Sequence, residues 1–290
     1  MTHNSLIKIG GVPEHFNLPW IQALESNKFS HLPTEISWSY FPGGTGAMTQ
    51  ALSRGDLDIA ILLTEGFMAA SIKGLEASII HRYIATPLNW GIYSGIQQPL
   101  QWSEKTKVAI SRKGSGSHLM AKIHSHQMGY ELKESQFIEV HHLEDAIQSL
   151  QKKETDYFYW EHWMTLKYVQ SQKIKQVGNF SAPWSGFLVV ATHQCIQEKS
   201  TLLQAIIEII KKESIQFIED EQTPENIARR FQLTVNEARQ WMIAQEWNFD
   251  HHLDYEEMQN ALHSLNQIGI NKDTLLLDEL KAPWLEWKRR

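Results

Sequence analysis

"FPGGTGAMTQALSRGDLDIAILLTEG", residues 41–66, joins a glycine cluster, a short helix-like stretch and an almost wholly apolar run. Residues 58–63 predict a buried parallel strand, because apolar side chains fill both of its faces. The strand stops abruptly at Thr64-Glu65-Gly66. Ligands of open α/β sheets bind outside the carboxyl ends of the strands, so this stop predicts the edge of a ligand-binding cleft.

The rest of the chain alternates strand-like and helix-like segments, which is typical of a mostly parallel sheet with helices on both faces. Strands are expected at residues 6–9, 35–41, 58–63, 78–93 with an interruption at 86–89, 108–111, 137–140, 157–160, 176–180 and 186–191. Helices are expected from near Asn17, a possible cap, and at residues 48–52, 67–73, 117–128, 144–152 and 162–170. Beyond residue 198 we expect only helices, at residues 201–219, 224–231, 235–247 and 255–268.

These segments form two similar series, and the turn "YFPGGTGAM" in the first matches "SRKGSGSHLM" in the second. We therefore predict an α/β protein of two lobes, each a mostly parallel sheet flanked by helices. The chain is expected to cross near residues 89–93 and to return near residues 184–188. Lobe I then holds residues 1–91 and 187–290, including the C-terminal helices, and lobe II holds residues 92–186. Two crossover strands at the hinge would form a cleft that can close.

Each glycine turn stands immediately before a helix. Glycine removes the bulk that would keep a ligand from the backbone, and the first N–H groups of a helix have no intrahelical partner. The residues expected to offer donors to a small acceptor group are Gly44, Thr45, Gly46, Ser115, Gly116, Ser117 and His118. In the alternative interpretation, the glycines only shape tight turns and the hydroxyl residues only cap helices. Neither turn has the spacing of a nucleotide-binding loop or of a nucleophile elbow.

A carboxylate stands at the end of an expected strand in each lobe. Glu65 follows Thr64 in the first lobe, and Glu161 follows Trp160 in the second. We expect the two carboxylates to face each other across the cleft and to bind N–H donors or positive charge. Alternatively, Glu65 only begins the next helix, where an acidic residue is favoured by the helix dipole. The aromatic candidates for stacking on a ligand, each of which could instead belong to the core, are Phe16, Tyr40, Trp90 and Trp184.

Composition argues against several classes of partner and site. The 290 residues carry a formal net charge of −6, whereas nucleic acid requires clustered Lys and Arg. The segment at residues 225–242 resembles a helix-turn-helix but has no basic face, so DNA binding is not expected. The single cysteine, Cys195, excludes an internal disulfide and a cysteine-built metal site. Neighbouring histidines diverge on a helix, so the 14 His residues predict no metal site.

The N-terminal sequence MTHNSLIKIGG shows no basic segment followed by a long apolar run, so no export signal is expected. The expected location is therefore the cytoplasm, or the periplasm if an export signal had been removed. No apolar stretch has the length that spans a bilayer, so direct membrane insertion is not expected.

The stretches "PGGTGAMTQALSRGDLDIAILLTEG", "SRKGSGSHLMAKIHSHQMGY" and "ETDYFYWE" resemble the type II periplasmic-binding-protein fold. The chain looks closest to the branch of nitrate-, sulfonate- and thiamine-pyrimidine-precursor-binding proteins. Within that branch it is similar, over nearly its whole length, to a group of signal-less proteins known from a Candida protein and from bacteria. The positions that match the family's motifs are Thr45, Gly46, Ala47, Thr64, Glu65, residues 115–117, Trp160 and Glu161.

The resemblance implies a bilobed solute-binding protein, and the paired donor turns agree with it. The predicted ligand is a small organic anion, a zwitterion or a pyrimidine-like heterocycle, held in the interlobe cleft with no cofactor and no metal. Ordinary members of the family hand their solute to a membrane transporter, which is therefore a possible partner. The alternative is a cytosolic enzyme on the same fold, acting in thiamine-precursor or menaquinone-type cofactor biosynthesis. In that case His118 or His162, both expected at the cleft, would act as acid or base.

Overall fold

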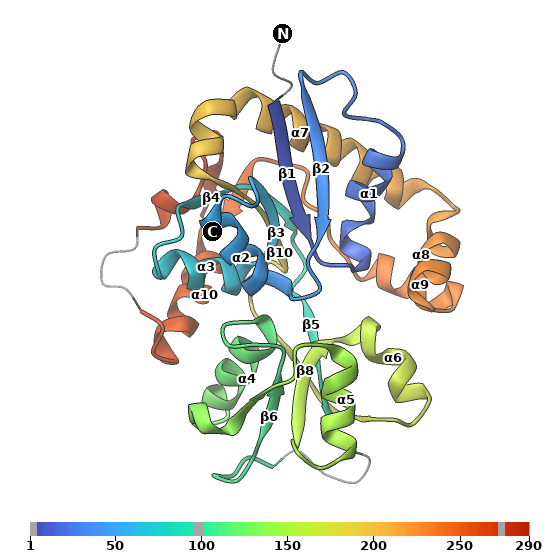
Figure 1. Ribbon diagram of the computed structural model, residues 1–290, viewed down its shortest axis with the longest axis vertical. Helices are drawn as coiled ribbons and strands as arrows, with labels where there is room; N and C mark the ends of the chain where they lie inside the picture. The colour runs from blue at the N-terminus through green and yellow to red at the C-terminus, as the bar shows by residue number, and fades with distance from the viewer. Residues whose placement is uncertain (1–4, 96–100, 272–275, 290) are drawn as a thin grey trace.

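The computed structural model describes residues 5–95, 101–271 and 276–289. Figure 1 shows two lobes, one above the other, with strand β5 (Asn89–Ser94) running between them. The first four residues of the N-terminal sequence, together with residues 96–100 of the predicted lobe II and residues 272–275 and 290 of the predicted lobe I, lie outside the described residues. Within the described ranges, no helix combines the length and hydropathy needed to cross a bilayer.

The upper sheet has five strands in the order β2-β1-β3-β10-β4. Their bounds are Ser5–Gly11 for β1, Thr34–Tyr40 for β2, Ile59–Leu63 for β3, Ala77–Ile84 for β4 and Phe187–Thr192 for β10. Strand β1 pairs in parallel with β2 and β3, whereas β10 pairs antiparallel with β3 and β4. Every residue of β3 is buried, which confirms the strand expected from its unbroken apolar sequence.

The lower sheet repeats this arrangement in the order β7-β6-β8-β5-β9. Besides β5, its strands are Val108–Ile110 for β6, Phe137–Glu139 for β7, Tyr157–Glu161 for β8 and Lys175–Ser181 for β9. Strand β6 pairs in parallel with β7 and β8, and β5 is antiparallel to β8 and β9. The two series that are similar in sequence therefore form two sheets of the same topology.

The predicted two-lobed α/β fold with mostly parallel sheets is confirmed, and each sheet contains one antiparallel strand. The antiparallel strand of each sheet is the one that has just arrived from the other lobe: β5 follows β4 of the upper sheet, and β10 follows β9 of the lower sheet. Each sheet is thus completed by a strand that the chain delivers from the opposite lobe. The lobe boundaries at residues 91 and 186 stay a prediction.

Ten α-helices surround the sheets in the described part of the chain. Their bounds are Leu18–Glu25 for α1, Gly44–Arg54 for α2, Thr64–Ile72 for α3, Gly116–Gln127 for α4, Leu143–Gln151 for α5, His162–Gln170 for α6, His193–Glu219 for α7, Thr223–Phe231 for α8, Val235–Ile243 for α9 and Tyr255–Gln267 for α10. Helices α3 and α6 begin directly after β3 and β8, with no loop between strand and helix. Their N-termini therefore lie at the strand ends.

Three local predictions are wrong. Asn17 does not cap α1 through its side chain, because its Nδ2 atom donates to the carbonyl of Val12 at 2.7 Å instead. The helix expected at residues 235–247 ends at Ile243, and the next residues are extended and bonded to the upper lobe; the N–H of Ala85 donates to the Glu246 carbonyl at 2.7 Å. The C-terminal region is not wholly helical, since β11 (His252–Asp254) pairs in parallel with β12 (Glu286–Lys288).

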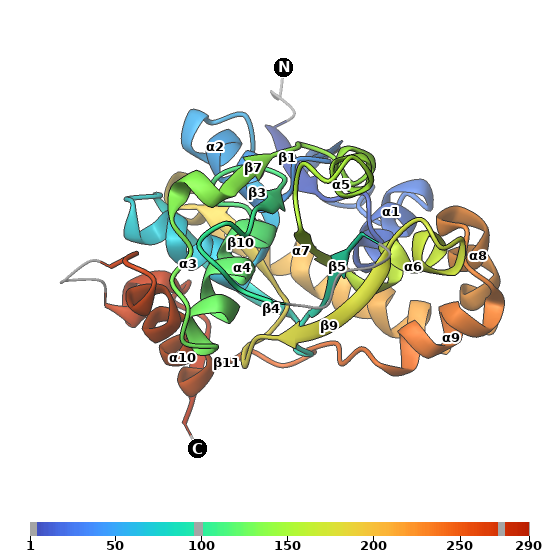
Figure 2. The ribbon, with the colours of Figure 1, turned by 90° about the horizontal axis from the view of Figure 1, so that it is seen from below.

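The C-terminal helices contact both lobes, whereas the sequence predicted packing on the first lobe. Helix α7 packs against α1, and α10 packs against both α3 and α4. In the view from below (Figure 2), α8 and α9 lie beside α6 of the lower lobe, and α10 lies beside α4. Two hydrogen bonds join α6 to the segment of α8 and α9: Gln170 Nε2 donates to Glu237 Oε1 at 2.6 Å, and Lys167 Nζ donates to Gln232 Oε1 at 3.1 Å. The two lobes are therefore bridged on both flanks.

The two chain crossings touch each other at Gly186 and Thr86. The N–H of Gly186 donates to the Thr86 carbonyl at 3.1 Å. A Cβ atom on Gly186 would lie 2.9 Å from that carbonyl oxygen, closer than real Cβ contacts allow. The returning crossing is also held to the upper lobe, because Thr64 Oγ1 donates to the Ser185 carbonyl at 2.6 Å and Arg82 Nε donates to Ser185 Oγ at 2.6 Å. The two chain crossings are thus hydrogen-bonded to each other and to the upper lobe.

We expect Gly186→Ala to lower the free energy of unfolding by about 1–3 kcal/mol, because backbone must move to admit the methyl group. Urea unfolding followed by circular dichroism measures this change. Gly178→Ala is the matched control: its Cβ would lie 3.4 Å from the end of the Ile92 side chain, which is an ordinary contact. Equal stability of the two variants would contradict the close approach of the crossings.

Candidate ligand-binding cleft

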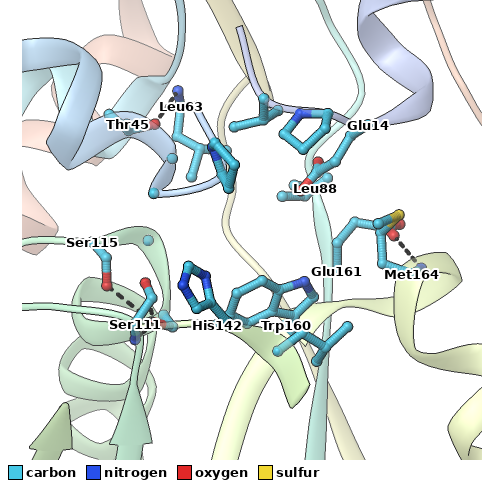
Figure 3. A pocket seen from close by; sticks show the side chains of 18 of the residues that line it. Glu14, Thr45, Leu63, Leu88, Ser111, Ser115, His142, Trp160, Glu161 and Met164 are labelled. Carbon is cyan, nitrogen blue, oxygen red and sulfur yellow. Dashed lines mark hydrogen bonds between the residues drawn. The ribbon is translucent and has the colours of Figure 1, made fainter. Parts of the chain in front are cut away.

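A cavity of about 230 Å³ lies between the lobes, where the ends of β3 and β8 approach each other. Figure 3 shows its side chains reaching in from both lobes. The residues around it are Val12, Pro13, Glu14, Pro42, Gly43, Gly44, Thr45, Leu63, Leu88, Trp90, Ser111, Ser115, Gly116, Ser117, His142, Leu143, Glu144, Trp160, Glu161, Met164 and Phe187. Its size suits a small organic molecule rather than a polymer.

The first glycine turn forms the N-terminus of α2 and borders the cavity. Gly44 has a φ of +65°, a conformation that glycine adopts without strain, and it starts the helix four residues before the expected Met48. The Oγ1 atom of Thr45 accepts a hydrogen bond from the N–H of Leu63 at 3.0 Å. This bond fixes the tip of α2 to the end of β3, so the tip cannot drift from the strand end.

The second turn forms the N-terminus of α4 on the opposite side of the cavity. Ser115 caps the helix: its Oγ atom accepts from the N–H of His118 at 3.4 Å and donates to the Arg112 carbonyl at 2.7 Å. Ser117 Oγ lies 3.0 Å from Ser115 Oγ and accepts from the N–H of Ser111 at 3.0 Å. The tips of α2 and α4 therefore border one shared cavity, from opposite lobes.

The lobes touch beside these tips. A Cβ atom on Gly116 would lie 2.6 Å from both Leu63 Cδ1 and Trp90 Cη2, so glycine is required for this approach. Arg112 donates from Nη2 to the Gly43 carbonyl, which joins the loop before α4 to the loop before α2. The two lobes are thus in contact along the side of the cavity where the N-termini of α2 and α4 lie.

The walls of the cavity are largely apolar, and its opposite side carries two carboxylates. Val12, Leu88, Trp90 and Phe187 are buried side chains of the walls. Figure 3 shows Glu14 coming from the upper lobe and Glu161 from the lower lobe, on the side away from Thr45 and Ser115, with the Glu161 carboxyl turned toward the N–H of Met164.

The pKa values of both carboxyl groups are raised. Burial and, as a smaller cause, the nearby charge of Glu14 together raise the pKa of Glu161 to about 8. Burial also raises the pKa of Glu14 to about 7. Both acids therefore titrate close to neutral pH, unlike carboxylates on a protein surface.

The prediction that Glu65 and Glu161 face each other across the cleft is wrong. Glu161 is the last residue of β8, whereas Glu65 is the second residue of α3, so the equivalent of Glu161 in the upper lobe is Leu63. Glu65 is buried beside the cavity and accepts a hydrogen bond from Trp184 Nε1 at 2.9 Å. Thr64, Glu65 and Trp184 therefore belong to the hinge packing and do not border the cavity.

Other predicted residues also lie elsewhere. Phe16 is buried in the core, with its ring 4.8 Å from that of Phe187, and Tyr40 is 54% exposed. Gly46 borders a separate groove between α2, α3 and α4, and Ala47 is not among the residues around the cavity. The predicted residues that the structure brings together at the cavity are Gly44, Thr45, Ser115, Gly116, Ser117, Trp160, Glu161 and Trp90.

The histidines weighed as acids or bases face away from the cavity. His118 Nδ1 accepts from the N–H of Gly114 at 2.9 Å, its ring packs on Phe137, and burial lowers its pKa to about 4. His162 packs on Trp163, and burial lowers its pKa too. Among the described residues, no group of three or more His, Cys, Asp or Glu side chains gathers where it could hold a metal ion.

Sequence reasoning missed Glu14 and His142. Glu14 lies in the loop between β1 and the 3-10 helix at His15–Asn17, and His142 lies immediately before α5. Neither belongs to a motif. The one available signal is position: Glu14 and His142 follow the carboxyl ends of the parallel strands β1 and β7, and Glu161 is the last residue of the parallel strand β8.

The buried Glu65 carboxyl group predicts a pH dependence of stability. Burial raises its pKa from 4.5 to about 7, so the folded protein holds a proton that the unfolded chain releases. Stability from this group is present below pH 4.5 and is lost as the pH rises through about 7. Between pH 4.5 and pH 8, wild-type protein should lose about 1–3 kcal/mol more unfolding free energy than Glu65→Gln.

Urea unfolding at a series of pH values measures this difference. Glu154→Gln, at an exposed position, is the control and should keep the wild-type profile. A Glu65→Gln profile parallel to that of the wild type would show that the carboxyl group is not desolvated.

Comparison with known proteins agrees with this geometry. A family model described as Ca3427-like PBP matches residues 90–180. No curated protein matches the sequence. Among solved structures, the chain is similar to the Candida albicans CA3427 gene product, which is described as defining a family with the generic periplasmic-binding-protein fold. The TM-score is 0.86 and the identity 25%, over 95% of this chain and 93% of that one.

Two further solved structures share the fold at lower identity. The alkanesulfonate-binding protein SsuA from Xanthomonas axonopodis pv. citri, bound to MOPS, has a TM-score of 0.77 and 13% identity, over 99% of this chain and 100% of that one. The ligand-binding component of an ABC-type import system from Staphylococcus aureus, with zinc bound, has a TM-score of 0.72 and 14% identity, over 96% and 97%. The likeness along almost the whole chain shows that this protein has the two-lobed type II periplasmic-binding-protein fold, and the family-model match over residues 90–180 shows that it is similar to the Ca3427-like proteins.

Proposed function

We propose that this protein is a solute-binding protein that holds one small organic molecule in the cavity between its lobes, without converting it. The observation that carries the proposal is the pair of helix N-termini, α2 and α4, which border the same cavity from opposite lobes. Their first N–H groups lack intrahelical partners and carry partial positive charge. An acceptor group of the solute would bind between them, next to the hydroxyl groups of Thr45, Ser115 and Ser117.

The solved relatives support a small ligand with such an acceptor group. SsuA from Xanthomonas was solved with MOPS, and the Staphylococcus protein belongs to an ABC-type import system. A small organic anion, a zwitterion and a pyrimidine-like heterocycle such as a thiamine precursor all fit this description. The flat rings of Trp90 and Trp160 suit a heterocycle as well as an alkyl chain.

A membrane transporter is the proposed partner, by analogy with the import-system relative. The enzyme alternative depended on His118 and His162, and neither is among the residues around the cavity.

Isothermal titration calorimetry tests the proposal with 1-propanesulfonate, methylphosphonate, MOPS and 4-aminopyrimidine, in a buffer without sulfonate, phosphate or amine groups. We expect at least one compound to bind in the cavity. Trp160→Ala should then weaken its binding by about tenfold or more, because the substitution removes the indole ring that borders the cavity.

Trp284→Ala is the matched control, because Trp284 is also half-buried but does not border the cavity. It should leave the dissociation constant unchanged. The proposal fails if none of the four compounds binds, or if both tryptophan variants weaken binding equally.

A further inference from the structure

Glu14 and Glu161 bring negative charge to the cavity from opposite lobes. Glu14 lies in the loop after β1 of the upper sheet, and Glu161 is the last residue of β8 in the lower sheet. Figure 3 shows both on the same side of the cavity, opposite Thr45 and Ser115. The charge of Glu14 raises the pKa of Glu161, and both residues border the cavity, so the two side chains lie near each other across the gap between the lobes.

Neither carboxylate has a basic partner within the described part of the chain. The ion pairs among the described residues involve other acids, and the charge that raises the pKa of Glu161 is that of Glu14. Arg112, near the helix tips, is engaged with the Gly43 carbonyl instead. Two ionised acids near each other without a cation are unfavourable in a partly desolvated site, so a positively charged group of a ligand would stabilise their ionised form.

The Glu161 side chain is positioned for such a group. It is only 4% exposed, and its Oε2 atom accepts from the N–H of Met164 at 2.8 Å as the cap of α6. The backbone N–H of Trp163 also hydrogen-bonds this carboxyl group, so two N–H groups at the start of α6 hold the carboxylate beside the cavity. The faces of Trp90 and Trp160 border the same space, and aromatic faces attract cations.

We propose that the solute carries a protonated amine that binds between Glu14 and Glu161, while its acceptor group binds at the tips of α2 and α4. The inference rests on the proposed function, and it narrows the ligand to a zwitterion or a cationic heterocycle. An organic ammonium fits better than a metal ion, because the surrounding walls are apolar and metal ions require more oxygen ligands. A plain organic anion would leave both acids unpaired.

Four other titratable residues lie near Glu14 and Glu161. Glu144 of α5 accepts from the hydroxyl of Tyr168 at 3.0 Å, and His142 borders the cavity before the same helix. His15 follows Glu14, and burial lowers its pKa to about 3; His162 follows Glu161, and burial lowers its pKa as well. Both of these histidines are therefore neutral at pH 7 and do not neutralise the acids.

Matched ligands test the amine directly. Aminoalkanesulfonates with two, three and four carbons are each compared with the alkanesulfonate of the same length, by calorimetry at pH 8. The best aminoalkanesulfonate should bind about tenfold or more tightly than its amine-free partner. At pH 7 it should also release protons, seen as a binding heat that depends on the buffer's ionisation enthalpy, because an ammonium group favours the charged carboxylates.

Glu14→Gln and Glu161→Gln should each reduce this preference to within about threefold, whereas the amine-free ligand should bind them no more weakly than the wild type. Glutamine keeps an oxygen that can accept from the Met164 N–H, so the cap of α6 survives, and urea unfolding checks that both variants fold. Glu154→Gln, in the same lobe but exposed, is the charge-matched control and should keep the wild-type preference.

Three outcomes would overturn the proposal. Equal affinity for the aminoalkanesulfonate and the alkanesulfonate of every pair would contradict the proposed amine but not the proposed solute-binding function. Zinc binding that Glu161→Gln abolishes, with no preference for the amine, would assign the acids to a metal ion. Binding of neither series, and of none of the four compounds named for the proposed function, would contradict that function together with this inference.

Discussion

The exchange of one strand between the two sheets sets the geometry of the whole molecule. Strand β4 runs in the same direction as β1, β2 and β3 and leads out of the upper sheet into β5. The carboxyl ends of all four strands must therefore face the lower lobe. Strand β9 imposes the same condition on the lower sheet, because it leads back into β10. Helices that follow these strand ends must begin at the gap, so the donor tips of α2 and α4 meet there as a consequence of topology.

This constraint explains which predictions from the sequence could succeed. The glycine turns, the apolar run of β3 and the repetition of the two series can be read directly from the sequence. They were sufficient to predict the two-lobed fold and the positions of both helix N-termini. To predict which carboxylate enters the cavity, one must know to the residue where the strand ends and the helix begins. Sequence alone does not show whether an acid is the last residue of a strand, like Glu161, or the second residue of the following helix, like Glu65. One or two residues decide whether the side chain enters the cavity or the hinge.

The remaining gaps in the prediction have a similar physical origin. Glu14 belongs to a loop, where neither periodicity nor a motif marks its direction, and only the tertiary approach of the lobes brings it near Glu161. The antiparallel placement of β5 and β10 follows from where the chain crosses, which apolar patterning does not encode. The C-terminal pair of β11 and β12 joins segments that are far apart in sequence and short, so neither segment shows a strand pattern of its own.

Leu63 and Glu161 occupy equivalent places at the ends of β3 and β8, and both border the cavity. Two halves with the same architecture would otherwise offer a guest the same chemistry from above and below, and it could enter in either of two orientations. One apolar and one acidic side chain at corresponding positions break that pseudo-symmetry. The difference gives the chamber a polarity of its own, so a guest with unlike ends can lie in it only one way round.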